Sequence, residues 1–86
     1  MRILSLRFLT RRGCHLCDDA RPILARVARD LGVTVEEVDV DRDEALTRAY
    51  GLRVPIVLAS HDRVVAEGVI DDRRLLRDAI KSVLDL

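Results

Sequence analysis

The stretch TRRGCHLC, residues 10–17, lies between a short apolar run and a helical pattern, and it holds both cysteines of the chain. Apolar and polar side chains alternate over residues 4–8, and Ile3 and Leu9 extend the apolar run, which predicts an inner strand with one fully buried face. Cys14 would then stand at the N-terminus of a helix and Cys17 one turn inside it. Two sulfurs in that arrangement can close and reopen a small disulfide, which suits electron exchange better than structural crosslinking.

Apolar residues recur at helical spacing after the second cysteine, and Gly32 ends the pattern, so we expect one helix over residues 14–31. Pro22 lies inside this helix and lacks the N–H that would bond the Asp18 carbonyl, which predicts a kink without a break. The stripe expected to face the core consists of Leu16, Ala20, Ile23, Leu24, Val27, Ala28 and Leu31.

The sequence predicts three further strands. β-branched residues on both sides of Glu36 and Glu37 indicate a strand over residues 33–40, with irregular pairing in its middle. Residues 55–59 and 63–67 are typical of an antiparallel hairpin, although its turn lacks the Asn-Gly or Asp-Gly pair that hairpins favour.

Two shorter helices complete the pattern. The first, over residues 43–50, is expected to bury Leu46, Ala49 and Tyr50. The second follows residues 71–72, two aspartates that are candidate helix caps. Its apolar stripe consists of Leu75, Leu76, Ala79, Ile80, Val83 and Leu84.

The order β-α-β-α-β-β-α predicts an α/β fold, a four-stranded mixed sheet with helices on both faces. The chain has 86 residues, 49% of them apolar, which suffices for one compact core. We find no linker, repeat or low-complexity segment and expect residues 1–86 to form a single domain.

Composition argues against several classes of partner. Lys plus Arg and Asp plus Glu number 15 each and are interspersed, so no strong field steers a polyanion or a membrane surface. With only 2% aromatic residues, base stacking on single-stranded nucleic acid is not expected. The N-terminal apolar run is too short and mixed for a signal-peptide core or a membrane span, and we expect a cytoplasmic protein.

Three positioned features make the chain resemble the thioredoxin superfamily: Cys14-x-x-Cys17 opening the first helix, Pro22 within that helix, and Val54-Pro55 leading the third strand. Within the superfamily it is most similar to the small glutaredoxins and glutaredoxin-like proteins. The resemblance implies a thioredoxin-like fold and dithiol-disulfide exchange, with the first cysteine as nucleophile and the second as resolving thiol. It also implies a cis bond before the second proline, which leaves the preceding backbone free to pair with an extended substrate or glutathione.

Contacts to glutathione also follow from the resemblance. Arg11 matches the basic residue that glutaredoxins place three positions before the nucleophile. Gly68, Asp71 and Asp72 match the segment that holds the γ-glutamyl end of glutathione.

The chain departs from the glutaredoxin pattern in two places. Val69 and Ile70 stand where the family prefers a second glycine and a small polar residue or cysteine, and this bears on how closely glutathione approaches the backbone. His15 and Leu16 replace the usual proline and tyrosine between the cysteines.

The attacking species is the thiolate, so the environment of Cys14 decides its reactivity. The helix N-terminus and the loop residues Arg11 and Arg12 favour the thiolate, whereas Asp18 and Asp19 oppose it. Because the dipole and the arginines lie nearer, we expect a lowered pKa for this thiol.

The sequence therefore predicts a monomeric oxidoreductase that reduces protein or glutathione mixed disulfides. Its electron donor would be glutathione or a reductase, and no segment implies a metal, flavin or nucleotide. Two other functions stay open: a non-catalytic redox sensor or adaptor, and a metal or iron–sulfur site bridging a dimer, because two cysteines supply half of a tetrahedral set.

Overall fold

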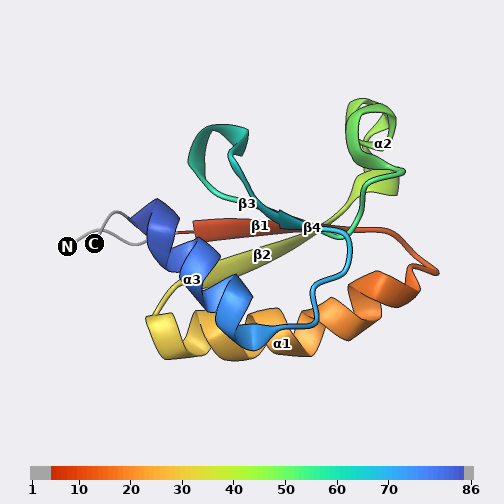
Figure 1. Ribbon diagram of the computed structural model, residues 1–86. Coiled ribbons are helices and arrows are strands. Elements are labelled where there is room, and N and C mark those ends of the chain that lie inside the picture. Colours follow the sequence, from red (N-terminus) through yellow and green to blue (C-terminus); the bar gives the residue numbers. More distant parts are fainter. Residues whose placement is uncertain (1–4, 85–86) are drawn as a thin grey trace.

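A computed structural model describes residues 5–84 of the chain, which contain four strands, three α-helices and two single turns of 3₁₀-helix. In order, the elements are β1 (Ser5–Thr10), α1 (His15–Leu31), β2 (Thr34–Asp39), η1 (Val40–Arg42), α2 (Glu44–Tyr50), β3 (Ile56–Leu58), η2 (Ser60–Asp62), β4 (Val64–Glu67) and α3 (Arg73–Leu84). The strands form one mixed sheet in the order β2-β1-β3-β4 (Figure 1). The predicted order of strands and helices is confirmed; residues 3 and 4 of the expected first strand lie outside the described residues.

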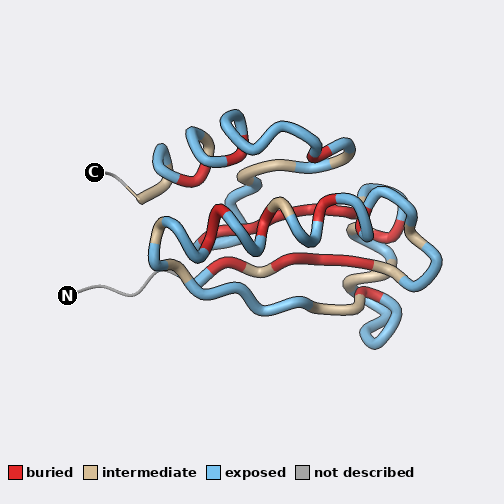
Figure 2. Tube along the Cα trace, turned by 90° about the horizontal axis from the view of Figure 1, so that it is seen from below, coloured by how far each residue is buried: buried red, intermediate tan, exposed pale blue. Residues whose placement is uncertain are grey.

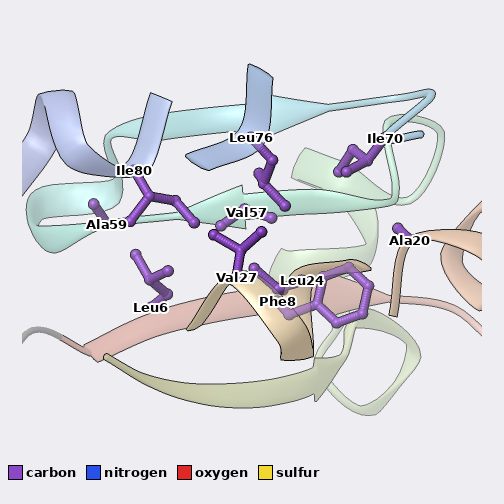
Figure 3. Packing of buried hydrophobic residues seen from close by; sticks show 10 residues of the cluster. All are labelled: Leu6, Phe8, Ala20, Leu24, Val27, Val57, Ala59, Ile70, Leu76 and Ile80. Atoms are coloured by element: carbon purple, nitrogen blue, oxygen red, sulfur yellow. The ribbon is translucent and has the colours of Figure 1, made fainter. Parts of the chain in front are cut away.

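Helices cover both faces of the sheet, as predicted. Helices α1 and α3 pack side by side on one face, and the short α2 lies on the other (Figure 1). Burial is concentrated in β1, β3 and the inner sides of α1 and α3 (Figure 2). The larger core cluster, drawn in Figure 3, consists of Leu6, Phe8, Ala20, Leu24, Val27, Val57, Ala59, Ile70, Leu76 and Ile80. The smaller one, under α2, consists of Leu9, Val40, Ile56 and Leu58.

Helix α1 begins and ends where the sequence predicts. Cys14 is its N-cap and Gly32 its C-cap. The glycine has φ +70°, a left-handed conformation that costs little without a Cβ, and its N–H bonds the Ala28 and Arg29 carbonyls. The helix continues without a break through Pro22.

Three apolar residues expected in the core are exposed instead. Leu16 is 38% exposed because the first turn of α1 projects past the strand ends (Figure 1). Leu75 is 68% exposed, since a helical position 100° away from buried Leu76 turns away from the sheet. In the short helix α2, Leu46 is half-buried and Ala49 is exposed, because only one side of the helix meets the sheet.

Strand β2 pairs regularly with β1, and the irregularity expected at Glu36 and Glu37 is absent from this ladder. The two strands are parallel and in continuous register from Ser5 opposite Thr34 to Thr10 opposite Asp39. As an edge strand, β2 lets both glutamates reach solvent without a bulge.

The hairpin of β3 and β4 turns through two left-handed residues, His61 at φ +60° and Asp62 at φ +57°. Both residue types tolerate this region better than most, which explains how the turn forms without the favoured dipeptides. The Asp62 carboxylate accepts a bond from Arg7 of β1, which holds the turn against the sheet.

The difference between the two faces of α3 gives a direct test of the packing. Ile80 is 0% exposed and Leu75 is 68% exposed on the same helix. Ile80→Ala is expected to lower the free energy of unfolding by about 2–5 kcal/mol, and Leu75→Ala by well under about 1 kcal/mol. Urea unfolding of the two variants in one redox state measures both values; equal losses would contradict this orientation of α3.

Candidate active site

Three segments meet at one end of the sheet: the cysteine loop after β1, the residues before β3, and the segment that follows β4. Strand β1 ends at Thr10, where the cysteine loop begins, and the antiparallel β3 starts at Ile56, which pairs with Leu9. The start of β3 therefore lies beside the cysteine loop, as Figure 1 also shows. Two hydrogen bonds join the three segments: Arg11 Nη1 donates to the Gly51 carbonyl at 3.0 Å, and the N–H of Gly68 donates to the Pro55 carbonyl at 2.9 Å.

The two cysteines form a disulfide at the N-terminus of α1, with Cα atoms 5.2 Å apart. Cys14 is half-buried, whereas Cys17 is 0% exposed. The backbone N–H of Cys17 donates to Cys14 Sγ at 3.0 Å. A helix N-terminus that points an N–H at a sulfur stabilises negative charge on it. The arrangement thus offers one accessible sulfur for attack and one buried sulfur behind it.

The peptide bond between Val54 and Pro55 is cis, as the resemblance implied. Pro55 is buried and Val54 is half-buried, directly before β3. The Pro55 carbonyl accepts the N–H of Gly68, which attaches the segment after β4 to the cis-proline.

Arg11, expected to bind glutathione, has three internal contacts. Its Nε and Nη2 each lie 3.1 Å from the Asp41 carboxylate, and its Nη1 bonds the Gly51 carbonyl. The side chain therefore joins the cysteine loop to the segment before the cis-proline.

The two aspartates before α3 have different roles in the fold. Asp72 caps the helix, accepting from the N–H groups of Arg74 and Leu75 at 2.9 and 3.1 Å. Asp71 is exposed. Both line a cavity of about 230 Å³ between β4 and α3.

The acidic residues that follow Cys17 each have a cationic or titratable partner. Asp18 lies 2.9 Å from Arg21, and Asp19 lies 3.3 Å from His15. The guanidinium of Arg21 reduces the opposition to a Cys14 thiolate that the sequence predicts from Asp18, and His15 does the same for Asp19 only when it is protonated.

A polar network beside the cysteines was not foreseen from the sequence. Arg21 donates two bonds to Glu37 of β2, at 2.9 and 2.8 Å, and Thr10 donates a third at 3.1 Å. The Arg21 guanidinium also lies over the ring of Phe8, 6.0 Å from its centroid. The hydrogen bonds from Arg21 lower the Glu37 pKa, burial opposes them with a smaller effect, and the bond from Thr10 lowers the pKa a little further. The glutamate in turn raises the Arg21 pKa. The network ties the start of α1 to the end of β1 and to β2.

The only local signal for this network was the Asp18–Arg21 spacing on one helix face. Its other members come from separate elements, which local periodicity does not connect.

Residues 5–84 contain neither a side-chain cluster suited to a metal ion nor a membrane-spanning helix. No group of three or more His, Cys, Asp or Glu side chains is placed to hold a metal ion within that range. None of the helices described there is long and apolar enough to cross a membrane.

Comparisons with known proteins agree with this geometry. The model of the Glutaredoxin-like domain (DUF836) family matches residues 5–85. A probable thioredoxin of Archaeoglobus fulgidus is 29% identical over 80 residues, 87% of this chain and 88% of that protein. An uncharacterized protein of Mycobacterium bovis is 30% identical over 83 residues, 91% of this chain and 84% of that protein.

Solved structures give the same picture. A structural-genomics target protein from X. campestris superposes with a TM-score of 0.75 at 34% identity, covering 90% of this chain and 96% of that chain. A mutant thioredoxin from Halobacterium salinarum does so with a TM-score of 0.72 at 31% identity, covering 96% of this chain and 76% of that one.

The Arg21–Glu37 contact predicts a pH-dependent term in stability. A lowered carboxyl pKa stabilises the folded state at neutral pH, and this contribution is lost as the pH falls from the ordinary glutamate pKa of 4.5 through the lower pKa of the folded state. Since both side chains are more than a third exposed, we expect Glu37→Gln to cost under about 1 kcal/mol at pH 7. Urea unfolding of wild type and variant at several values between pH 7 and pH 3 is expected to show the difference shrinking toward zero.

Glu36→Gln is the matched control. It removes the same charge from the neighbouring residue, and the Glu36 side chain has no ion pair within the described part of the chain. A wild-type minus Glu37→Gln difference that stays constant with pH would contradict the assignment.

Proposed function

The chain belongs to the Glutaredoxin-like domain (DUF836) family, in the thioredoxin superfamily, and from this we propose that it is a dithiol-disulfide oxidoreductase that reduces protein or glutathione mixed disulfides. The observation that carries the proposal is the Cys14–Cys17 disulfide at the N-terminus of α1, with one half-buried and one buried sulfur. A crosslink across one helical turn closes too small a loop to contribute much to stability. Reversible exchange is the use that such a pair serves best.

The proposed reaction has two exchange steps. In the reduced protein, the Cys14 thiolate attacks one sulfur of the substrate disulfide, the substrate S–S bond breaks, and the first substrate thiolate leaves with the electron pair. Cys17 then loses its proton and attacks Cys14 Sγ, which releases the second substrate thiol and forms the Cys14–Cys17 disulfide. Two electrons from glutathione or a reductase restore the dithiol.

The backbone N–H of Cys17 supports the role of Cys14 as nucleophile. It donates to Cys14 Sγ at 3.0 Å and would bond a thiolate more strongly than a neutral thiol. Cys17 is buried and shielded from external disulfides, so it suits the resolving step, which takes place within the protein.

The cis Val54–Pro55 bond supports a substrate-binding role for the segment beside the disulfide. In the proposed complex the Val54 backbone pairs with an extended substrate or with glutathione. Asp71 and Asp72 would face the amino end of glutathione, and Arg11 a carboxylate if it exchanges its Asp41 partner. We further propose that the protein acts as a monomer in the cytoplasm, where thiols are kept reduced.

Single replacements separate the two cysteines. Cys14→Ser is expected to abolish turnover, because no accessible nucleophile remains. Cys17→Ser is expected to retain at most monothiol exchange with glutathione and to accumulate mixed disulfides with protein substrates. Steady-state assays with mass spectrometry of trapped species measure both outcomes, and full dithiol activity in the Cys14→Ser protein would refute the proposal.

The reactivity of the nucleophile is tested by alkylation. In reduced Cys17→Ser, the rate of Cys14 alkylation against pH is expected to have its midpoint below the free-cysteine value of about 8.5. The same variant in concentrated urea is the control, since unfolding removes the helix N-terminus. A folded-state midpoint at or above the unfolded one would favour a sensor or adaptor over an enzyme.

A further inference from the structure

A cavity of about 230 Å³ opens between β4 and α3, where residues 68–72 cross from one to the other. Its inner wall includes Ile70 and Leu76, which belong to the core and are labelled in Figure 3. Val69 and Leu75 also line it, yet they are 64% and 68% exposed. The cavity thus combines a buried apolar floor with two aliphatic side chains open to water.

Carboxylates give this cavity a charge preference. Asp71 and Asp72 are its only charged lining residues, and both are acidic. Asp72 uses one oxygen to cap α3, and Asp71 is exposed. An occupant with a positive charge beside an aliphatic group would match the cavity in both respects.

The segment that lines the cavity is joined by one backbone hydrogen bond to the cis-proline beside the disulfide. Gly68, which begins the crossing segment, donates its N–H to the carbonyl of cis-Pro55. A polypeptide bound beside the cis-proline can reach the cavity within a few residues, since an extended chain advances about 3.3 Å per residue.

We propose that this cavity binds a side chain of the polypeptide whose disulfide the protein reduces. The occupant is an aliphatic residue a few positions from the substrate cysteine, with a neighbouring lysine or arginine facing Asp71 and Asp72. Glutathione could place its amino end at Asp71 and Asp72 but carries no aliphatic side chain to fill the cavity, so the site favours protein disulfides over glutathione. This inference rests on the proposed oxidoreductase function.

Single-turnover kinetics test the selection without any electron donor. The substrates are peptides of about ten residues, long enough to place a side chain up to five residues from the cysteine. Their single cysteine is joined to thionitrobenzoate. Attack of Cys14 on the peptide sulfur forms the peptide–Cys14 disulfide and releases coloured thionitrobenzoate with the electron pair. Within the series, leucine followed by lysine moves from two to five residues away from the cysteine on either side. Matched peptides carry serine for leucine, or glutamate for lysine.

One placement of leucine is expected to raise the second-order rate constant of the reduced wild-type protein roughly tenfold or more over the serine peptide, as filling an apolar pocket does. Glutamate in place of lysine is expected to lower it. Leu75→Gln with Val69→Thr is expected to remove the leucine advantage while leaving the reaction with a small aromatic disulfide unchanged. Val35→Thr, an exposed aliphatic on the opposite edge strand, is the matched control and is expected to keep the advantage.

The outcomes separate the two proposals. Equal rates for leucine and serine peptides at every placement, with the small disulfide still reduced, would overturn the subsite and leave the oxidoreductase function standing. The subsite would also be overturned, and the oxidoreductase function would stand, if the double variant Val69→Thr, Leu75→Gln kept the full leucine advantage. No reaction with any disulfide would overturn the proposed function and this inference with it.

Discussion

Strand β1 is hydrogen-bonded on both edges, to β2 in parallel and to β3 in antiparallel register, and the functional segments take their positions from this pairing. Its side chains bury on both faces, Leu6 and Phe8 toward α1 and α3 and Leu9 toward α2. A one-residue slip would exchange the two sets, so the register is strongly fixed. Since β1 leads into the cysteine loop and β3 begins after cis-Pro55, the same register brings the disulfide and the proline to one end of the sheet.

The electrostatics of this end follow from pairing within the fold. Arg11 is held by Asp41 and Gly51, and Arg21 is held by Glu37 and Asp18. These cations position backbone segments instead of standing free in the loop. The hydrogen bond that the structure directs at Cys14 Sγ comes from the backbone N–H of Cys17, which salt does not remove, whereas the exposed charge of Arg12 is screened by it. The proposed reactivity of the thiol therefore depends on where α1 begins more than on loop charges.

The segment between β4 and α3 shows how a departure from the glutaredoxin pattern changes a surface. Ile70 is part of the main core, so its size contributes to packing and anchors the segment. Val69, its neighbour, is exposed at the cavity. The pair that replaces small residues thus fills the core with one side chain and presents the other to solvent. This change is the structural basis for expecting a polypeptide substrate at this site.

The sequence by itself determined the order of elements, the caps Cys14 and Gly32, and the placement of the cysteines at a helix start, because these depend on local spacing and on residue types. The tertiary structure alone decided which stripe residues are buried: Leu75 is as apolar as Leu76, but one helix face meets the sheet and the other does not. It also decided that Arg21 and Thr10 meet at Glu37, and that Arg11 binds Asp41. Such contacts join side chains from separate elements, and their partners are chosen by the sheet register and helix packing, which no local pattern encodes.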